Sequence, residues 1–298
     1  MIMRKTTTDA CFCSTGTYYG GMRDSGAYAL TAEASELACE GVRAASAAMQ
    51  IGIPADMDRS RIHAIRNHAK KGRARLEEAG FAIESFQIRG TVNAALAVPE
   101  VTVTLMGTAR AEETTEEIPR AGQQILQVGW IGLEGMLRII GEREGELKKR
   151  FTPAFLGQMK AYDDELFKID RLEMARAAGI RFIRQIGAGG ILAALHDLAD
   201  ETQSGIRVDL NRIAIRQETI EVCEYYRINP YQLASAGSFL MLSKDAEAFE
   251  RLKAAGIPAA VIGQTTGDHD KVIHNGEDIR YIDRPAPDEL YKVIRKGE

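Results

Sequence analysis

A polar stretch near the middle of the 298-residue chain separates two halves, each of which alternates helix-like and strand-like patterns. Residues 110–124 are rich in glutamate, contain Pro119 and lack apolar periodicity, which is typical of a linker. A chain of this length can form one large domain or two domains of ordinary size. We therefore predict two domains, residues 1–118 and residues 119–298.

The first half has the pattern of a sheet backed by helices. Residues 26–49 are alanine-rich and predict one helix. Asp58 or Ser60 can cap a second helix, in which apolar residues recur every three or four positions up to Gly80. Apolar and β-branched runs predict strands at 81–88 and 101–106. These elements predict an α+β unit.

The second half repeats the alternation of strands and helices after the polar stretch. The predicted strands are 125–128, 207–210, 237–242, 258–263, 271–274 and 279–283. The predicted helices are 136–150, 217–226 and 246–255. The fold class expected for the whole chain is therefore α+β, in two domains.

A glycine-rich bend in the second half leads directly into an amphipathic helix. Gly187, Gly189 and Gly190 let the backbone approach a ligand with its N–H groups outward, and the helix that follows adds the positive end of its dipole. From Arg184 to Gly190 there is neither a carboxylate for a metal nor a lysine for a phosphate. The bend predicts an anion cradle. A dinucleotide fingerprint is disfavoured because Leu192 replaces its third glycine.

Composition excludes several classes of function. A net charge of −4 argues against nucleic-acid binding, and no apolar run approaches the roughly 20 residues of a membrane-spanning helix. We expect a cytoplasmic protein. The four cysteines favour reduced, structural thiols over a metal or redox role, and they are Cys11, Cys13, Cys39 and Cys223.

Four other polar or aromatic residues admit two interpretations each. Trp130 suits a core or interface anchor better than a base-stacking platform. Glu134 can line a cleft or stand solvated in the first turn of a helix. His196 and Asp197 are adjacent, and adjacent helical residues point about 100° apart, so a solvated helix face is favoured over a catalytic pair.

Several blocks of sequence, in this order and spacing, resemble the AIR synthase-related superfamily. Within it they are most similar to the branch of hydrogenase expression/formation, or maturation, factors. The blocks of the second half are 130–135, 189–191, 215–219 and 229–237. In the first half, Thr8 and Asp9 resemble the end of a Ser-Thr-Asp strand, and 33–38 resembles an Ala-Asn-Asp-Ile-Ala helix.

The resemblance implies a two-domain AIR synthase-like fold. Its N-terminal domain would dimerise by joining sheets, which gives a homodimer, and its C-terminal domain would close over the first. Active members bind ATP with Mg²⁺ in the cleft and transfer a phosphoryl group to an amide-type oxygen. Such chemistry needs carboxylates for the metal ions and glycine loops for the phosphate oxygens.

The sequence departs from the family pattern at several of these positions. Little chain precedes the Ser-Thr-Asp-like position, so we expect a shortened N-terminal domain. Arg89 stands in the turn where the family has His-Thr-Glu, and Arg184 begins the segment that replaces its His-Asp-x-x-Glu. Asp9 and Glu36 remain as oxygen donors, and this pair could hold one Mg²⁺ through waters but makes a poor site for two.

The two arginines suggest a site of a different kind. An anionic ligand could bind Arg89, Arg184 and the amides of Gly187, Gly189 and Gly190 without a metal. The alternative, which we favour slightly, is that both arginines pair with neighbouring acids on a site that is no longer used.

Three functions remain open at this point. The chain could be an ATP-dependent enzyme of the AIR synthase-like kind. It could be a lapsed member that binds a nucleotide or another anion as a regulator. It could also be a structural partner in a mixed dimer with a complete relative. The shortened N-terminal domain expected from the resemblance favours the second and third functions, whereas the intact blocks of the second half keep the first one open.

Overall fold

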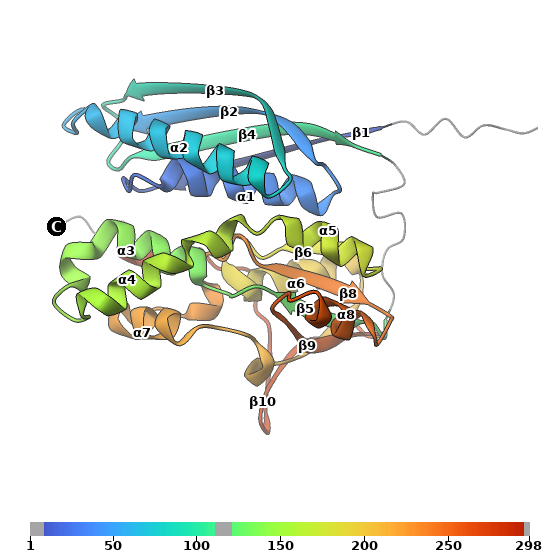
Figure 1. Ribbon diagram of the computed structural model, residues 1–298. Coiled ribbons are helices and arrows are strands. Elements are labelled where there is room, and N and C mark those ends of the chain that lie inside the picture. The colour runs from blue at the N-terminus through green and yellow to red at the C-terminus, as the bar shows by residue number, and fades with distance from the viewer. Residues whose placement is uncertain (1–8, 111–120, 295–298) are drawn as a thin grey trace, which may run out of the picture.

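The computed structural model describes residues 9–110 and 121–294, and these form two layered units stacked on one another (Figure 1). The first unit contains a four-stranded sheet in the order β1-β4-β2-β3, and the second contains a seven-stranded sheet in the order β11-β10-β7-β9-β5-β8-β6. The α+β fold is thus confirmed. The predicted boundary at residue 118, like Thr8, lies outside the described residues.

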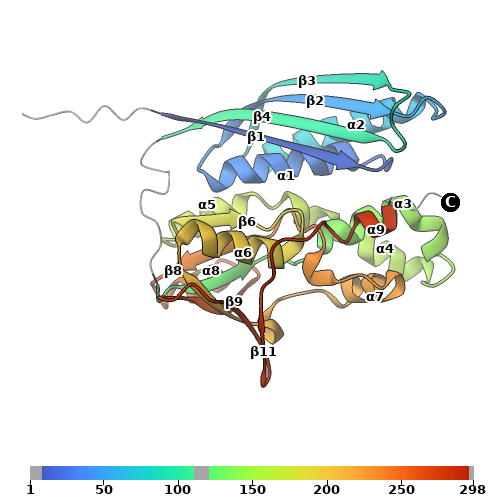
Figure 2. The same ribbon diagram turned by 180° about the vertical axis from the view of Figure 1, so that it is seen from behind.

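The first unit is a sheet with both of its helices on one face (Figure 2). Strand β4 pairs antiparallel with β1 and β2, and β3 runs parallel to β2. On the opposite face, alternate residues of β1 and β2 are exposed. The elements are β1 (Ala10–Tyr19), α1 (Ser25–Cys39), β2 (Ala44–Ile53), α2 (Ser60–Glu78), β3 (Ala82–Val92) and β4 (Glu100–Ala109).

The single helix predicted for residues 26–49 is wrong, because the helix ends at Cys39 and the chain resumes as strand β2. Gly41 has a φ of +87°, and its N–H bonds to Ala38 while that of Val42 bonds to Leu37. This pattern is a Schellman motif, which terminates a helix on a left-handed residue. The alanines of β2 fit a strand here because every second residue packs under the helices.

The second unit contains every strand and helix predicted for it, with ends shifted by a few residues. The sequence patterns missed the region between α3 and β6, where the helices are short. The elements are β5 (Gln124–Val128), α3 (Leu133–Leu147), α4 (Pro153–Ala161), η1 (Tyr162–Phe167), α5 (Asp170–Ala177), β6 (Phe182–Gln185), α6 (Gly190–Thr202), β7 (Gly205–Asp209), η2 (Leu210–Arg212), α7 (Gln217–Tyr226), η3 (Pro230–Gln232), β8 (Phe239–Ser243), α8 (Ala248–Ala254), β9 (Ala259–Thr266), β10 (Lys271–Asn275), β11 (Asp278–Tyr281) and α9 (Tyr291–Ile294).

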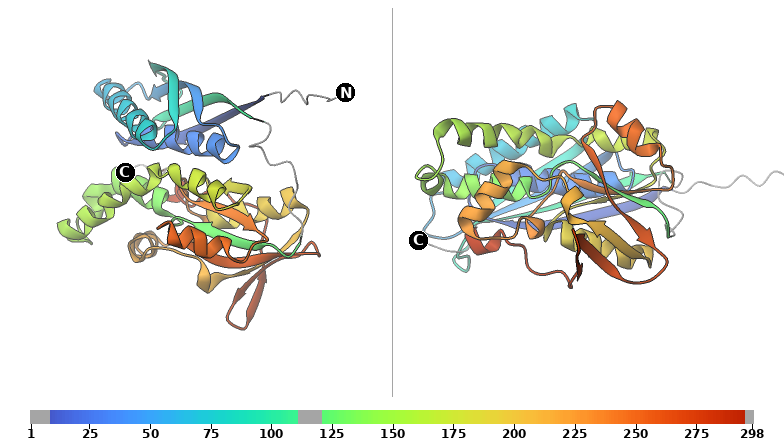
Figure 3. Two further views of the ribbon diagram at one scale, coloured as in Figure 1. Left: turned by 45° about the vertical axis from the view of Figure 1, so that its right-hand side comes forward. Right: turned by 90° about the horizontal axis from the view of Figure 1, so that it is seen from below.

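Helix α1 lies between its own sheet and the second unit, as the left-hand view of Figure 3 shows. Every residue of α1 except Glu36 is buried, which explains why most residues of the helix are apolar or small. Arg176 of α5 donates to the carbonyls of Ala38 and Cys39 at the end of α1. Gln185 of β6 donates to the carbonyl of Ala32. These contacts fix the two units against each other.

Among the residues that the structure describes, no helix is both long enough and apolar enough to cross a membrane.

Candidate interdomain ligand site

The two units share a pocket of ≈ 370 Å³ along the inner side of β1 and α1. Residues from both units form its wall, so the pocket exists only because the units are packed together. Its polar and glycine lining includes Ser14, Gly16, Tyr18, Glu33, Glu36, Glu134, Arg138, Gln185, Gly187, Asp288 and Tyr291.

Glu33 forms the side of the pocket contributed by the first unit. Its carboxylate accepts hydrogen bonds from the hydroxyls of Ser14 and Tyr18, at 2.5 and 3.0 Å, and the residue is only 6% exposed. A Cβ on Gly16 would lie 2.1 Å from Glu33 Oε1, so the strand needs a glycine opposite this carboxylate. Burial raises the pKa of Glu33 and also that of Tyr18.

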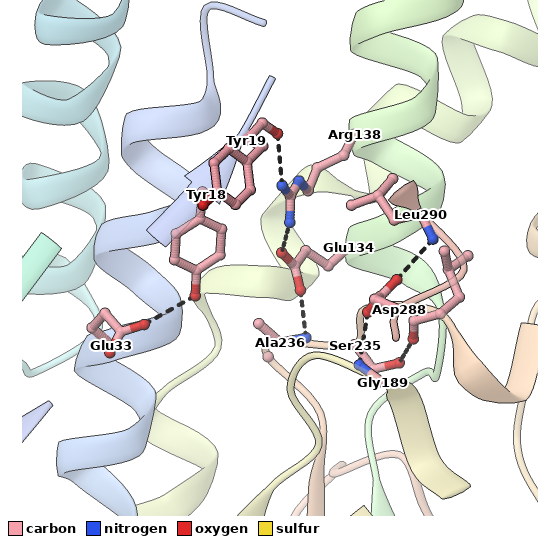
Figure 4. A network of polar contacts seen from close by, with 12 residues as sticks. Tyr18, Tyr19, Glu33, Glu134, Arg138, Gly189, Ser235, Ala236, Asp288 and Leu290 are labelled. Carbon is pink, nitrogen blue, oxygen red and sulfur yellow. Dashed lines mark hydrogen bonds and ion pairs between the residues drawn. The ribbon is translucent and has the colours of Figure 1, made fainter. Parts of the chain in front are cut away.

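Glu134 and Arg138 form a buried ion pair at the start of α3 (Figure 4). Arg138 Nη1 lies 3.2 Å from Glu134 Oε1, and its Nη2 donates to the carbonyl of Tyr19 across the domain junction. The second oxygen of Glu134 accepts the backbone N–H of Ala236 at 2.9 Å. The guanidinium of Arg138 is thus already engaged by the protein on two sides.

The predicted anion cradle is occupied by a carboxylate of the chain itself. Gly189 and Gly190 have φ values of +77° and +66°, as the tight bend before α6 requires. The N–H of Gly189 donates to Asp288 Oδ2 at 2.7 Å, and the other oxygen of Asp288 accepts the N–H of Leu290 at 2.8 Å. Asp288 is 6% exposed, and this burial raises its pKa. Figure 4 shows Asp288 between the two N–H groups.

The structure brings only part of the predicted site to the pocket. Gly187 and Glu36 line it, and Glu36 Oε1 accepts from Gln185 Nε2 at 2.8 Å. Desolvation raises the pKa of the Glu36 carboxyl, although the side chain is exposed to the open pocket. Gly189 and Gly190 complete the adjacent bend.

Three other predicted residues lie elsewhere. Asp9 lines a separate hollow beside Arg43. Arg89 is exposed on β3, at the opposite edge of the sheet from β1. Arg184 is held by acidic side chains of α6, with its Nη2 3.0 Å from Asp197 and its Nη1 2.5 Å from Glu201. The metal-free anion site predicted from the two arginines is therefore not assembled in this chain.

A magnesium ion shared by Asp9 and Glu36 does not fit this arrangement, because the two carboxylates line different hollows. Within residues 9–110 and 121–294, no three His, Cys, Asp or Glu side chains are grouped to hold a metal ion. The pocket instead presents four carboxylates and one arginine, all of them hydrogen-bonded to protein groups. An acidic wall of this kind suits a ligand that donates hydrogen bonds.

Sequence patterns gave no signal for two of the pocket residues, Arg138 and Asp288. Glu33 lay inside a block that resembles a family helix, but the expected ligand in that block was Glu36. For Glu134, of the two interpretations left open, the structure favours the one in which it lines the cleft. Asp288 comes far along the chain from the glycine bend, so only the tertiary fold reveals their contact.

The fold and pocket define a class of protein with two α+β units and a polar ligand pocket at their junction. Residues 120–275, more than half of the chain, match the family described as AIR synthase related protein, C-terminal domain. The chain belongs to this family, and its relatives include hydrogenase-maturation proteins, as the sequence blocks predicted.

Two curated relatives illustrate the similarity. Carbamoyl dehydratase HypE of Rhodobacter capsulatus is 30% identical over 101 residues, which cover 32% of this chain and 30% of the relative. MJ0676 of Methanocaldococcus jannaschii, whose name assigns it to hydrogenase expression/formation, is 27% identical over 180 residues, covering 58% of this chain and 51% of the relative. The chain thus matches less than a third of the first relative and about half of the second.

Solved structures show the same fold over nearly the whole chain. E. coli HypE, a hydrogenase maturation protein, has a TM-score of 0.73 at 17% identity and covers 96% of this chain and 89% of that one. The hydrogenase maturation protein HypE in complex with ATP has a TM-score of 0.70 at 17% identity, covering 96% and 88%.

Proposed function

We propose that this chain is a cytoplasmic, maturation-type member of the family whose interdomain pocket binds an amide-type group. In this proposal the ATP-dependent phosphoryl transfer with Mg²⁺ that the family implies is altered or lapsed. The observation that carries the proposal is that acids of the chain itself engage the groups expected to meet phosphate. Asp288 accepts a hydrogen bond from the N–H of Gly189, while Asp197 and Glu201 form ion pairs with Arg184.

The charge of the pocket supports an amide-type ligand. A free phosphate would face the carboxylates of Glu33, Glu36, Glu134 and Asp288 with only Arg138 in compensation. An amide is neutral, and its NH₂ group donates to carboxylate oxygens while its carbonyl accepts from a guanidinium. The pocket offers both partners, so it complements an amide better than a free anion.

Binding of acetamide and of acetate tests the ligand class. The two molecules have the same size, but acetamide has an NH₂ group where acetate has a negatively charged oxygen. We expect acetamide to bind about tenfold more tightly, measured by NMR chemical shifts of pocket residues. Acetate binding as tight as acetamide binding would contradict the amide assignment.

Titration with ATP, with and without MgCl₂, and an assay of phosphate release test whether phosphoryl transfer is altered or lapsed. We expect no magnesium-dependent turnover. Turnover that Glu36→Gln abolishes would show a working phosphoryl-transfer site in the pocket and would overturn this part of the proposal.

A second candidate is a non-catalytic partner or regulator that acts as a dimer, either with itself or with a complete relative. The uncovered face of the first sheet supports it. There Thr15 pairs with Thr104, and Thr17 with Thr102, each hydroxyl pair at 3.0 Å, and Met106 is 52% exposed. A flat face of small, mostly neutral side chains suits contact with a second sheet.

A further inference from the structure

The chain after β11 returns to the domain junction and closes one side of the pocket. We call residues 282–294 the strap. Its beginning is fixed by the N–H of Ile282, which donates to the carbonyl of Lys271 at 2.8 Å. Residues 283–287, which include two prolines, are exposed. Asp288, Glu289, Leu290 and Val293 are buried again, whereas Lys292 is exposed.

The second half of the strap contacts both units. Leu290 is 1% exposed and lines the pocket beside Tyr291. The ring of Tyr291 meets the ring of Tyr19, at the end of β1, edge to face with centroids 5.9 Å apart. Arg143 of α3 donates to the carbonyl of Val293 at 2.9 Å. The strap therefore spans the mouth between the first sheet and α3.

Asp288 joins the strap to the glycine bend. Its carboxylate receives the Gly189 N–H from the bend and the Leu290 N–H from the strap itself. The neighbouring N–H of Glu289 donates to the carbonyl of Gln232 at 3.2 Å. A carboxylate at the beginning of a thirteen-residue helix also gains from the helix dipole. An external anion and Asp288 would compete for the same N–H group.

We propose that the strap is an autoinhibitory device: Asp288 occupies the glycine bend with the chain's own carboxylate, and an external anion reaches the bend only when the strap lifts. The exposed residues 284–287, which include both prolines, are the hinge, and the anchors at 290–294 separate from Tyr19 and Arg143 on opening. Anion binding and strap release are then linked equilibria, so each promotes the other by the same factor.

Inorganic phosphate and amide hydrogen exchange test the device. Asp288→Ala vacates the Gly189 N–H, and we expect phosphate to bind at least about tenfold more tightly than to the wild type in calorimetry. Exchange at 290–294 should rise by a similar factor. Asp283→Ala is the matched control, because it removes the same charge from an exposed position in the same strap. It should behave as the wild type.

Asp288→Asn keeps the shape of the side chain and guards against a folding defect in the alanine variant. An amide has one acceptor oxygen for the two N–H donors, so an intermediate increase in exchange is expected. If both Asp288 variants match Asp283→Ala in phosphate affinity and in exchange, the device does not exist. This outcome is independent of the acetamide and ATP tests, since neither readout requires a pocket ligand or turnover.

Discussion

The environment of Glu33 departs clearly from that of a surface glutamate. Two hydroxyls hold its carboxylate, and the absence of a side chain at Gly16 leaves the room that it occupies. A carboxyl that is removed from water keeps its proton to higher pH. Burial therefore raises the pKa of Glu33, a carboxyl on the wall of a ligand pocket.

The raised pKa of Glu33 predicts how stability changes with pH. The folded state binds this proton more strongly than the unfolded chain, so the stabilisation is complete below the glutamate pKa of the unfolded chain, about 4.3, and is lost as pH rises through the folded pKa. Glu33→Gln removes this loss. We expect its free energy of unfolding, from urea titrations between pH 4 and 7, to decline less with pH than that of the wild type.

Glu144 supplies the control for that experiment. Hydrogen bonds and ion pairs with Lys160 and Lys148 hold the pKa of Glu144 at about 2, which is a shift in the opposite direction. Glu144→Gln should leave the pH dependence above pH 5 unchanged. If the free energy of unfolding of Glu33→Gln changes with pH in parallel with that of the wild type, ionisation of Glu33 does not destabilise the folded state.

At the scale of elements, the glycine bend before α6 shows that a local sequence pattern can predict a backbone conformation without predicting what binds to it. The glycines predicted a bend with free N–H groups, and the bend is present. Its N–H group meets Asp288, a residue about a hundred positions away, so no local pattern could reveal that the cradle is filled. Helix α1 is a similar case, since its Gly41 stop signal was present but was outweighed by the alanine content around it.

The outer face of the first sheet carries a prediction about assembly. If two chains join through this face, Thr104→Lys places a charge in the contact, and two-fold symmetry places a second one opposite. We expect the dimer to dissociate at least about tenfold more readily, measured by light scattering with size-exclusion chromatography. Asn67→Lys, on the exposed side of α2, is the control. A wild type that is monomeric at micromolar concentration would exclude this homodimer.

At the scale of the whole molecule, the junction of the units decides whether the pocket exists. Asp163 of η1 accepts from Tyr28 of α1 and from Arg75 of α2, each at 2.5 Å, and it is 31% exposed as a side chain. The guanidinium of Arg75 lies over the ring of Phe167 at 3.5 Å. Burial and the nearby Asp163 carboxylate raise the pKa of Tyr28. One carboxylate thus links both helices of the first unit to the second.

Removing that carboxylate should weaken the junction. Asp163→Ala leaves two donors without their acceptor, and we expect a loss of about 1–3 kcal/mol in the free energy of unfolding. Asp164→Ala is a matched control, because Asp164 pairs with the same Arg75 but its side chain is 80% exposed. Its expected cost is below about 1 kcal/mol. Urea unfolding measures both, and equal losses would show that Asp163 is no more important than a surface partner.

The sequence by itself determined the α+β class, the order of most helices and strands, and the family, because these depend on periodicity and on blocks of neighbouring residues. It also located the glycine bend and Glu36. Only the tertiary structure decided which side chains share a pocket. Arg184 forms an ion pair with α6. Asp9 and Arg89 lie apart from the pocket. Glu33, Arg138 and Asp288 converge on it. Such convergence is set by how the two units pack, a contact between distant segments that no local pattern encodes.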